Sequence, residues 1–259
     1  MMRLVLVIFA LLAAAPANAQ VMTLTGAGKA TAGYIGPTLD PGTVTAVTLS
    51  NGNLTATNTG TTSQDQGAHT PTTTNNKTSG KFYFEVTFDT VGVSGSNYGF
   101  GVGRTTSTYT NMGFNAVTGN MIYSSGNIWR NGINSGLSLG VRASGDVIGM
   151  AVDIGNLKVW YKKVNGTPTD WNGVPTDNPA TNTGGVAMPS LSGASMIPFV
   201  TFGGTGGVAS RVMTANFGAS VFVGTVPSGF TSGWTLNFLL ASDINPANDN
   251  VPMFLPRAA

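Results

Sequence analysis

The chain has no cysteine, and only one of its 259 residues is histidine. No disulfide can therefore hold the fold and no thiol chemistry is available, so stability must come from sheet hydrogen bonding and packing. The histidine, His69, lies in a polar stretch of threonine, asparagine and glutamine residues between 58 and 78, where we expect a solvated surface position. A single histidine in such surroundings argues against a Ser-His-Asp triad and against a histidine-rich metal site. We predict no catalytic residue and no metal ligand.

Glutamate is equally rare, since Glu85 is the only one among ten acidic residues. Glycoside hydrolases, which also use sandwich folds, need two carboxylates across the scissile bond. Glu85 and Asp89 would share one face of a strand, but they lie about 13 Å apart at roughly 3.3 Å per residue. This separation exceeds that of both known types of carboxylate pair. We therefore predict that the protein is not an enzyme.

Charge is scarce as well: charged residues make up 8% of the chain, and the net charge is +2. No basic stripe of the kind that nucleic-acid binding requires is present, so we expect no nucleic-acid partner. The glycines at 99, 101 and 103 have the spacing of a phosphate loop, but no helix pattern follows them. A phosphate site needs that helix N-terminus, so we predict no nucleotide and no other cofactor.

The only long apolar run lies at the N-terminus. Residues 1–19 combine Arg3, an apolar segment at 4–15 and the A-x-A cleavage pattern Ala17-Asn18-Ala19, which is typical of a secretory signal peptide. The alternative is a membrane anchor, but about a dozen apolar residues are fewer than the roughly 20 that a spanning helix needs. We predict a secreted protein, periplasmic or extracellular, with no transmembrane segment after signal cleavage. An irregular leader (20–42), one domain (43–240) and a loosely attached tail (241–259) would follow.

Residues 145–166 contain two β-rich runs joined by Gly155 and Asn156. This loop permits a type II′ turn, because glycine adopts a positive φ without steric cost, and the turn then fixes the register of the strands. One face of the hairpin carries only large apolar pairs, which we expect in the core: Ile154 with Leu157, Val152 with Val159, and Met150 with Tyr161. The other face pairs Asp153 with Lys158, Ala151 with Trp160, and Gly149 with Lys162. Trp160 is the unusual residue of this second face.

Other segments also alternate as strands do. Residues 81–89 place four apolar side chains on one side, namely Phe82, Phe84, Val86 and Phe88. Strand patterns return at 98–103, 119–136, 197–203 and 212–218, and residues 167–191 form a long loop with four prolines. No amphipathic helix is evident after residue 19. The sequence thus predicts an all-β protein, an antiparallel β-sandwich with long connecting loops.

Several motifs together resemble SPRY (B30.2-like) domains, particularly those of bacterial and bacteriophage proteins. The central hairpin, with Asp146-Val147-Ile148-Gly149 and the run from Lys158 to Gly166, resembles the central hairpin of that family. The order and spacing of further segments agree, and the resemblance extends over residues 43–234. These segments are 48–56, 79–86, 98–103, 171–173, 178–185, 197–200 and 215–218. The resemblance implies a concanavalin A-like sandwich of the jelly-roll type.

The resemblance also implies a non-catalytic recognition module that binds a protein or peptide through loops at one edge of the sandwich. No contact residue of animal SPRY domains is carried over to this chain. A lectin-like module that binds glycan is the alternative, because aromatic side chains with Asn and Asp neighbours suit sugar faces as well. A third possibility is a structural role on a virion or cell surface.

Aromatic and hydrogen-bonding side chains gather in three places outside the expected core. Trp, Tyr and Arg are the side chains that most often anchor interfaces. Trp160 has only Ala151 and Gly149 beside it, which would leave its ring accessible unless another segment folds over it. The predicted ligand-binding residues are Tyr123, Trp129, Arg130, Asn131, Trp160 and Trp171.

Overall fold

The computed structural model describes residues 36–60, 66–91, 98–107, 118–203 and 210–235. The predicted signal peptide (1–19), residues 20–35 of the predicted leader and the predicted tail (241–259) lie outside the described residues, so these boundaries stay predictions. None of the described residues belongs to a helix long and apolar enough to cross a membrane.

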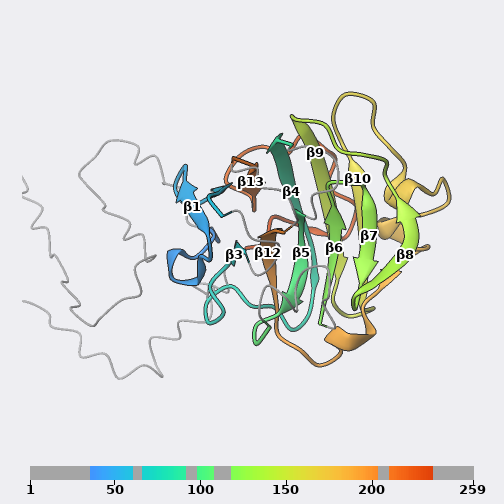
Figure 1. The fold of residues 1–259 in the computed structure, drawn as a ribbon. Coiled ribbons are helices and arrows are strands. Elements are labelled where there is room, and N and C mark those ends of the chain that lie inside the picture. Colours follow the sequence, from blue (N-terminus) through green and yellow to red (C-terminus); the bar gives the residue numbers. More distant parts are fainter. Residues whose placement is uncertain (1–35, 61–65, 92–97, 108–117, 204–209, 236–259) are drawn as a thin grey trace, which may run out of the picture.

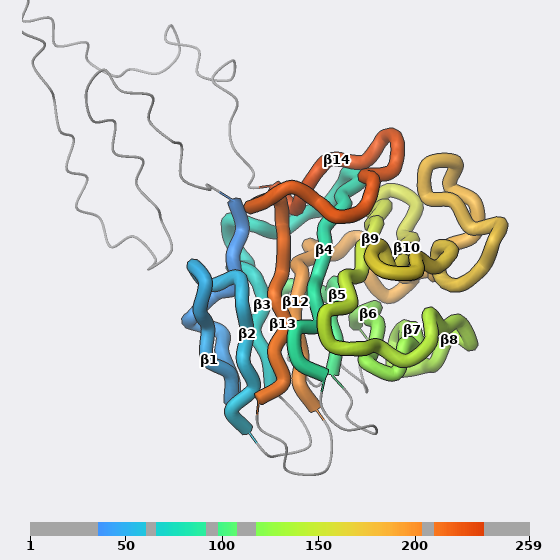
Figure 2. The backbone as a smooth tube through the Cα atoms, turned by 90° about the horizontal axis from the view of Figure 1, so that it is seen from above, coloured from blue at the N-terminus to red at the C-terminus, as the bar shows by residue number. Residues whose placement is uncertain are grey.

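The described strands form two sheets stacked face to face (Figures 1 and 2). The large sheet has the order β1 (Val47–Ser50), β2 (Thr55–Asn58), β13 (Val212–Asn216), β4 (Lys81–Thr90), β9 (Asp146–Asp153), β10 (Lys158–Lys163) and β11 (Val186–Ala187), with β14 (Thr231–Ser232) also paired to β4. The small sheet has the order β3 (Gly67–His69), β12 (Met196–Phe202), β5 (Tyr98–Arg104), β6 (Gly119–Tyr123), β7 (Asn127–Arg130) and β8 (Ile133–Ser138). Every pairing is antiparallel except the short one between β14 and β4. The predicted all-β antiparallel sandwich is confirmed.

The central hairpin has the predicted register. Val159 pairs with Val152, Tyr161 with Met150, and Trp160 with Ala151. The predicted type II′ turn is wrong, because Leu157 has the positive φ (51°) and Gly155 does not. The carboxylate of Asp153 accepts hydrogen bonds from the Asn156 backbone N–H (3.0 Å) and side-chain amide (2.8 Å). These bonds stabilise a wider loop in place of the two-residue turn.

The core lies between the two sheets and is built by alternate residues of their strands. Phe84 of β4 and Phe100 of β5 meet across it, with ring centroids 6.1 Å apart. The inward side chains predicted for β4 and for the central hairpin lie in or against this core. Burial of such aromatic side chains contributes the largest favourable terms to folding. The face of each sheet that turns away from this core is called its outer face below.

Two loop predictions need correction. His69 belongs to β3 and is half-buried, not solvated in a loop, because it pairs with Phe199 of β12. The long loop after β10 contains β11 and three short 3₁₀ helices, η2 (Trp171–Gly173), η3 (Pro179–Thr181) and η4 (Pro189–Leu191). Asp177 organises this loop by accepting hydrogen bonds from Asn172 (2.8 Å) and from Gly185 N–H (3.1 Å). A fourth 3₁₀ helix, η1 (Pro41–Thr43), precedes β1.

Candidate functional site

Trp160 lies on the outer face of the large sheet, as its register requires, but its ring is fully buried. Of the two outcomes that the sequence left open, the ring is covered by other segments and not accessible. Phe230 packs edge-on against it, and the indole N–H donates to the carbonyl of Thr183 (2.9 Å). Gly185 passes so close that a Cβ there would lie 2.5 Å from the ring. Two segments distant in sequence thus cover Trp160, and the pattern of its own strand carries no sign of them.

Trp171 joins the same outer-face cluster and remains half-buried. Its ring meets Tyr83 edge-on, with centroids 6.5 Å apart, and Lys162 Nζ lies 5.8 Å from the ring centroid. Next along the chain, the Asn172 side chain accepts a hydrogen bond from the backbone N–H of Tyr161 (2.9 Å) and so fixes η2 against β10. Trp171 therefore belongs to a packed aromatic layer over the large sheet.

Residues 218–230, called the C-terminal strap below, cross this outer face beside β4 (Figure 2). Phe222 of the strap packs edge-on against Tyr83, with centroids 5.1 Å apart. The carboxylate of Glu85 accepts hydrogen bonds from Val223 N–H (2.9 Å), Gly224 N–H (2.7 Å) and the Tyr83 hydroxyl (2.7 Å). Burial, followed by this hydrogen bond and the charge of Glu85, raises the pKa of Tyr83 well above its ordinary range. The only glutamate of the chain thus holds the strap in place.

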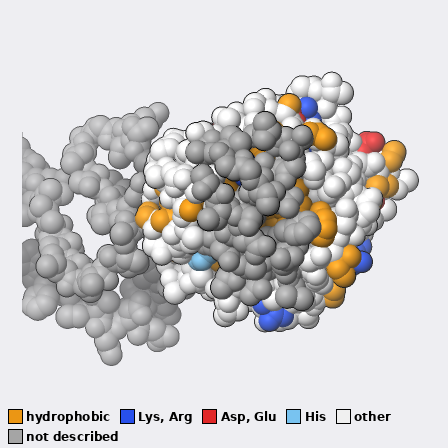
Figure 3. Space-filling model, in the orientation of Figure 1, with side chains coloured by type: hydrophobic (Ala, Val, Ile, Leu, Met, Phe, Trp, Pro, Cys, Tyr) orange, Lys and Arg blue, Asp and Glu red, His pale blue; other side chains and the backbone are white. Residues whose placement is uncertain are grey.

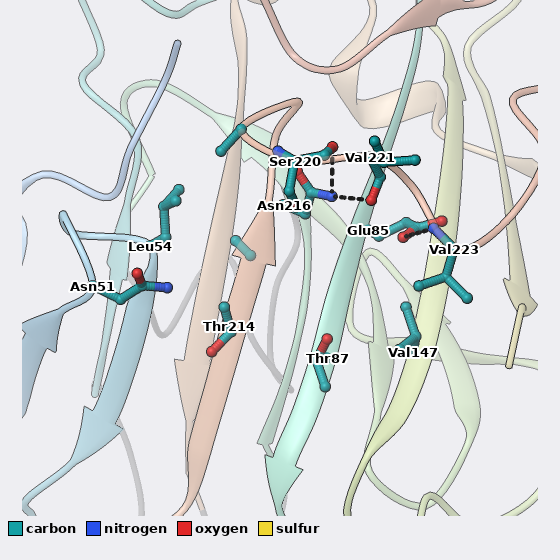
Figure 4. A pocket seen from close by; sticks show the side chains of 12 residues that line it. Asn51, Leu54, Glu85, Thr87, Val147, Thr214, Asn216, Ser220, Val221 and Val223 are labelled. Carbon is teal, nitrogen blue, oxygen red and sulfur yellow. Dashed lines mark hydrogen bonds between the residues drawn. The ribbon is translucent and has the colours of Figure 1, made fainter. Parts of the chain in front are cut away.

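A pocket of about 350 Å³ opens beside the strap on the same face (Figure 4). Thr87 of β4 and Thr214 of β13 point into it from neighbouring strands, and Val147 of β9 lies at its side. Val221 and Val223 of the strap line it as well, and they are 94% and 59% exposed. The sequence analysis did not identify this pocket, because its wall comes from the strap and its floor from strands far apart in sequence.

Tyr123 and Trp129 lie on the outer face of the small sheet, where their rings meet edge-on at 5.8 Å. Tyr123 is buried together with Met121 and Phe199, and this burial raises the pKa of its hydroxyl well above the ordinary range. Trp129 remains half-buried. The ring of Trp129 is therefore the more accessible of the two.

Arg130 and Asn131 form the tip of the hairpin that joins β7 to β8. Asn131 and Gly132 have φ values of 51° and 74°, and Arg130 pairs with Ile133, which together define the two-residue type I′ turn that Asn-Gly favours. The backbone N–H of Asn131 donates to Gly119 (3.1 Å), and its side chain bonds to Ser190 of η4. The tip is thus fixed to the body of the sandwich.

The same tip exposes two large side chains. Arg130 is exposed, and its guanidinium makes no hydrogen bond or ion pair with a described residue. Ile133, which the sequence analysis did not select, is 65% exposed. The Asn-Gly pair immediately before it is the signal that marks a hairpin tip, and hence an exposed position.

The six predicted ligand-binding residues do not form one site. Tyr123, Trp129, Arg130 and Asn131 belong to the small sheet and its hairpin tip, whereas Trp160 and Trp171 lie on the outer face of the large sheet. The core separates these two outer faces. Binding by each residue stays a prediction, but a single ligand contacting all six is not compatible with this arrangement.

The buried aspartates of the large sheet are engaged in ion pairs. Asp153 pairs with Lys81 (2.8 Å), and Asp146 pairs with Lys163 (2.6 Å) and lies 3.9 Å from Arg142. The described residues contain no group of three or more His, Asp or Glu side chains that could hold a metal ion. Charged side chains are also sparse on the surface seen in Figure 3.

Solved structures that resemble this one include the following three. The SPRY domain of human HERC1 aligns with 68% of this chain and 96% of its own, at 17% identity and a TM-score of 0.52. The TRIM65 PSpry domain aligns over 71% and 93% at 15% identity and a TM-score of 0.45. Stonustoxin aligns over 70% of this chain and 27% of its own, at 17% identity and a TM-score of 0.44.

No family model matches the sequence, and no curated protein matches it. The likeness to the HERC1 domain shows that the described part of the chain has the SPRY fold, as the motifs in the sequence indicated. The bacterial or bacteriophage type of that fold stays a prediction.

Proposed function

We propose that the chain is a secreted, non-catalytic recognition module that binds a protein or peptide. The SPRY fold supports this proposal by analogy alone. A fold does not determine a function, which depends on particular surface residues. Secretion is supported by the signal-peptide pattern of residues 1–19. Sequencing of the N-terminus of the exported chain checks it: we expect Gln20, and retention of Met1 contradicts it.

The hairpin tip between β7 and β8 is the observation on which this proposal rests. It presents Arg130, whose guanidinium has no partner among the described residues, beside the exposed Ile133, and the half-buried Trp129 lies on the opposite face of the same hairpin. Trp and Arg are enriched among the residues that dominate binding energy, and a tip that is already fixed loses little entropy when it binds. A folded or extended polypeptide segment that packs on the tip fits these side chains.

A phage-displayed library of random peptides provides a direct test with the full chain as bait. We expect enrichment of related peptides whose binding is lost in Arg130→Ala and Ile133→Ser. Val141→Ser is the matched control, because Val141 is 75% exposed and lies beyond the other end of β8. Substitution of a central contact typically lowers affinity by at least about tenfold, while the control leaves it unchanged.

The alternative, a lectin-like module, predicts a different result. Selective binding on a glycan array, with no peptide enriched from the library, contradicts the proposal and supports glycan recognition. Peptide binding that is equally sensitive to Val141→Ser and Ile133→Ser contradicts the assignment to the hairpin tip.

A further inference from the structure

Glu85 differs from the other buried carboxylates of the large sheet because no cationic side chain in the described part of the chain pairs with it. Asp146 and Asp153 are paired with lysine side chains at 2.6 and 2.8 Å. Glu85 is 2% exposed, and the described residues provide it with hydrogen-bond donors but no ion pair. A buried charge is costly unless an opposite charge or a full set of hydrogen bonds compensates it.

The hydrogen bonds to Glu85 leave room for one more. An ionised carboxylate offers about four acceptor positions, and three donors occupy Glu85. Oε1 accepts from Tyr83 and Gly224, whereas Oε2 accepts only from Val223. Oε2 thus has an acceptor position that no described residue occupies, and a donor that carries a positive charge would also neutralise the carboxylate.

The pocket beside the strap places this carboxylate within reach of a ligand. Glu85 is the only charged residue among the twelve that line it, so the lining has no cationic side chain that would form an ion pair with an anion (Figure 4). Thr87 contributes a half-buried hydroxyl that has no hydrogen-bond partner among the described residues. The volume of about 350 Å³ is at the lower end of the range for small-ligand sites. No aromatic side chain lines the pocket as a platform for a sugar ring.

We propose that this pocket binds a cationic group, an ammonium or a guanidinium, which pairs with Glu85 while the Thr87 hydroxyl accepts a second hydrogen bond. Val147 and Val221 would contact the apolar stem that carries the cation. The site lies on the outer face of the large sheet, whereas the hairpin tip belongs to the small sheet, so this proposal does not rest on the proposed function. Either proposal can fail while the other holds.

Calorimetric titration of the full chain tests the pocket with three probes. Agmatine and cadaverine supply a free guanidinium and free amines, and the capped peptide acetyl-Gly-Lys-Gly-amide supplies a lysine side chain. We expect saturable binding that weakens as salt is added, because the attraction is electrostatic. Tighter binding of the peptide identifies a protein partner as the source of the cation, and tighter binding of the free amines identifies a small-molecule ligand. Absence of binding by all three probes, or binding of glucose but of no cation, overturns the proposal.

Two substitutions relate binding to the pocket. Glu85→Gln removes the charge and should raise the Kd about tenfold or more. Hydrogen exchange at Val223 and Gly224 reports whether the strap remains in place in that variant. If it does and affinity is unchanged, the proposal is overturned.

The second substitution does not disturb Glu85. Thr87 lies two residues further along β4 on the same face, roughly 6.6 Å away at about 3.3 Å per residue, so a lysine there reaches the carboxylate. We expect Thr87→Lys to occupy the pocket itself, abolishing agmatine binding and raising the Tm above that of the size-matched Thr87→Met. A lower Tm for Thr87→Lys than for Thr87→Met, or agmatine binding unchanged in it, contradicts a cation site.

Discussion

At the scale of the residue, Trp160 and Trp129 each follow a β-branched residue in a strand, but the two rings differ in burial. Trp160 is fully buried between Phe230 and the loop that supplies its hydrogen-bond acceptor, Thr183. We expect Trp160→Ala to lower the free energy of unfolding by about 3 to 5 kcal/mol, because it leaves a cavity and removes one of the two hydrogen bonds to the Thr183 carbonyl. Urea unfolding followed by circular dichroism measures this loss.

Trp129→Ala is the matched control for that experiment, since Trp129 is only half-buried and packs edge-on against Tyr123. It should cost clearly less stability than Trp160→Ala, because less apolar surface is lost from the packed interior. Equal losses in the two variants would show that the outer face of the small sheet is packed as tightly as that of the large one.

The register of the central hairpin shows what could be predicted at this scale. Alternation along each strand of the hairpin correctly placed Met150 and Val152 of β9 in the core and Trp160 of β10 on the other face. Whether that other face is covered depends on Phe230 and Gly185, which come from segments 70 and 25 residues further along the chain. Local periodicity carries no information about such distant contacts, so the sequence left open whether Trp160 is exposed or covered.

At the scale of the element, β8 is an edge strand whose backbone is partly protected by its own side chains. The side chain of Asn134 accepts a hydrogen bond from Gly136 N–H (2.9 Å), and the hydroxyl of Ser135 accepts one from Leu137 N–H (3.2 Å). Gly136 has a φ of 79°, so the strand is also irregular at this point. Such features hinder pairing with the edge of another sheet.

We expect the double variant Asn134→Ala, Ser135→Ala to self-associate more than the original chain, because it frees two backbone donors at an exposed edge. Sedimentation velocity over a range of protein concentrations measures the association. Val141→Ala is the control, because Val141 is 75% exposed just beyond this strand and its apolar side chain accepts no hydrogen bond. If the double variant stays as monodisperse as this control, the side chains do not protect the edge.

Elements were easier to predict than the surfaces that they carry. Phe82 and Phe84 alternate with Tyr83 and Glu85, so the sequence defined both faces of β4. The polar face was nevertheless buried by the strap, whose Val223 and Gly224 bond to Glu85 through backbone groups. Backbone donors are the same in every residue, so nothing in the sequence identified these partners.

At the scale of the whole molecule, the sandwich has a covered outer face as well as a core. Aromatic side chains of the large sheet and the strap form an apolar layer outside the core, and the sheet itself separates this layer from the core. With no disulfide in the chain, this layer and the buried ion pairs help to hold the strap and the strands β4, β9 and β10 together. Stability should therefore depend on the charge state of the groups that hold it.

The pKa shifts predict a decline of stability in two stages as the pH falls. Burial lowers the pKa of His69 from its ordinary value of 6.5, although the Thr70 carbonyl and Asp40 oppose this effect. The folded state then binds this proton less readily than the unfolded state does. The contribution of neutral His69 to the free energy of unfolding is complete above about pH 6.5, and it is lost as the pH falls toward and through the lowered pKa.

The aspartates add the second stage. Burial alone would raise the pKa of Asp153, but the hydrogen bonds and charge of Lys81 and the hydrogen bonds of Asn156 lower it below 3.8. The pKa of Asp146 is likewise lowered by Ala143, Lys163 and Arg142 against the effect of burial. Their contribution is present above about pH 4 and disappears as the pH falls through the lowered values.

Urea unfolding at pH values from 8 to 2 measures both stages in one series. His69→Gln should flatten the decline that begins near pH 6.5 and leave the acidic one in place. Asp153→Asn should instead reduce stability at neutral pH and diminish the fall below about pH 4, because it removes both the ion pair with Lys81 and the carboxylate that titrates. A stability that rises on acidification from pH 7 to 5, or an acidic decline unchanged in Asp153→Asn, contradicts the placement of these groups.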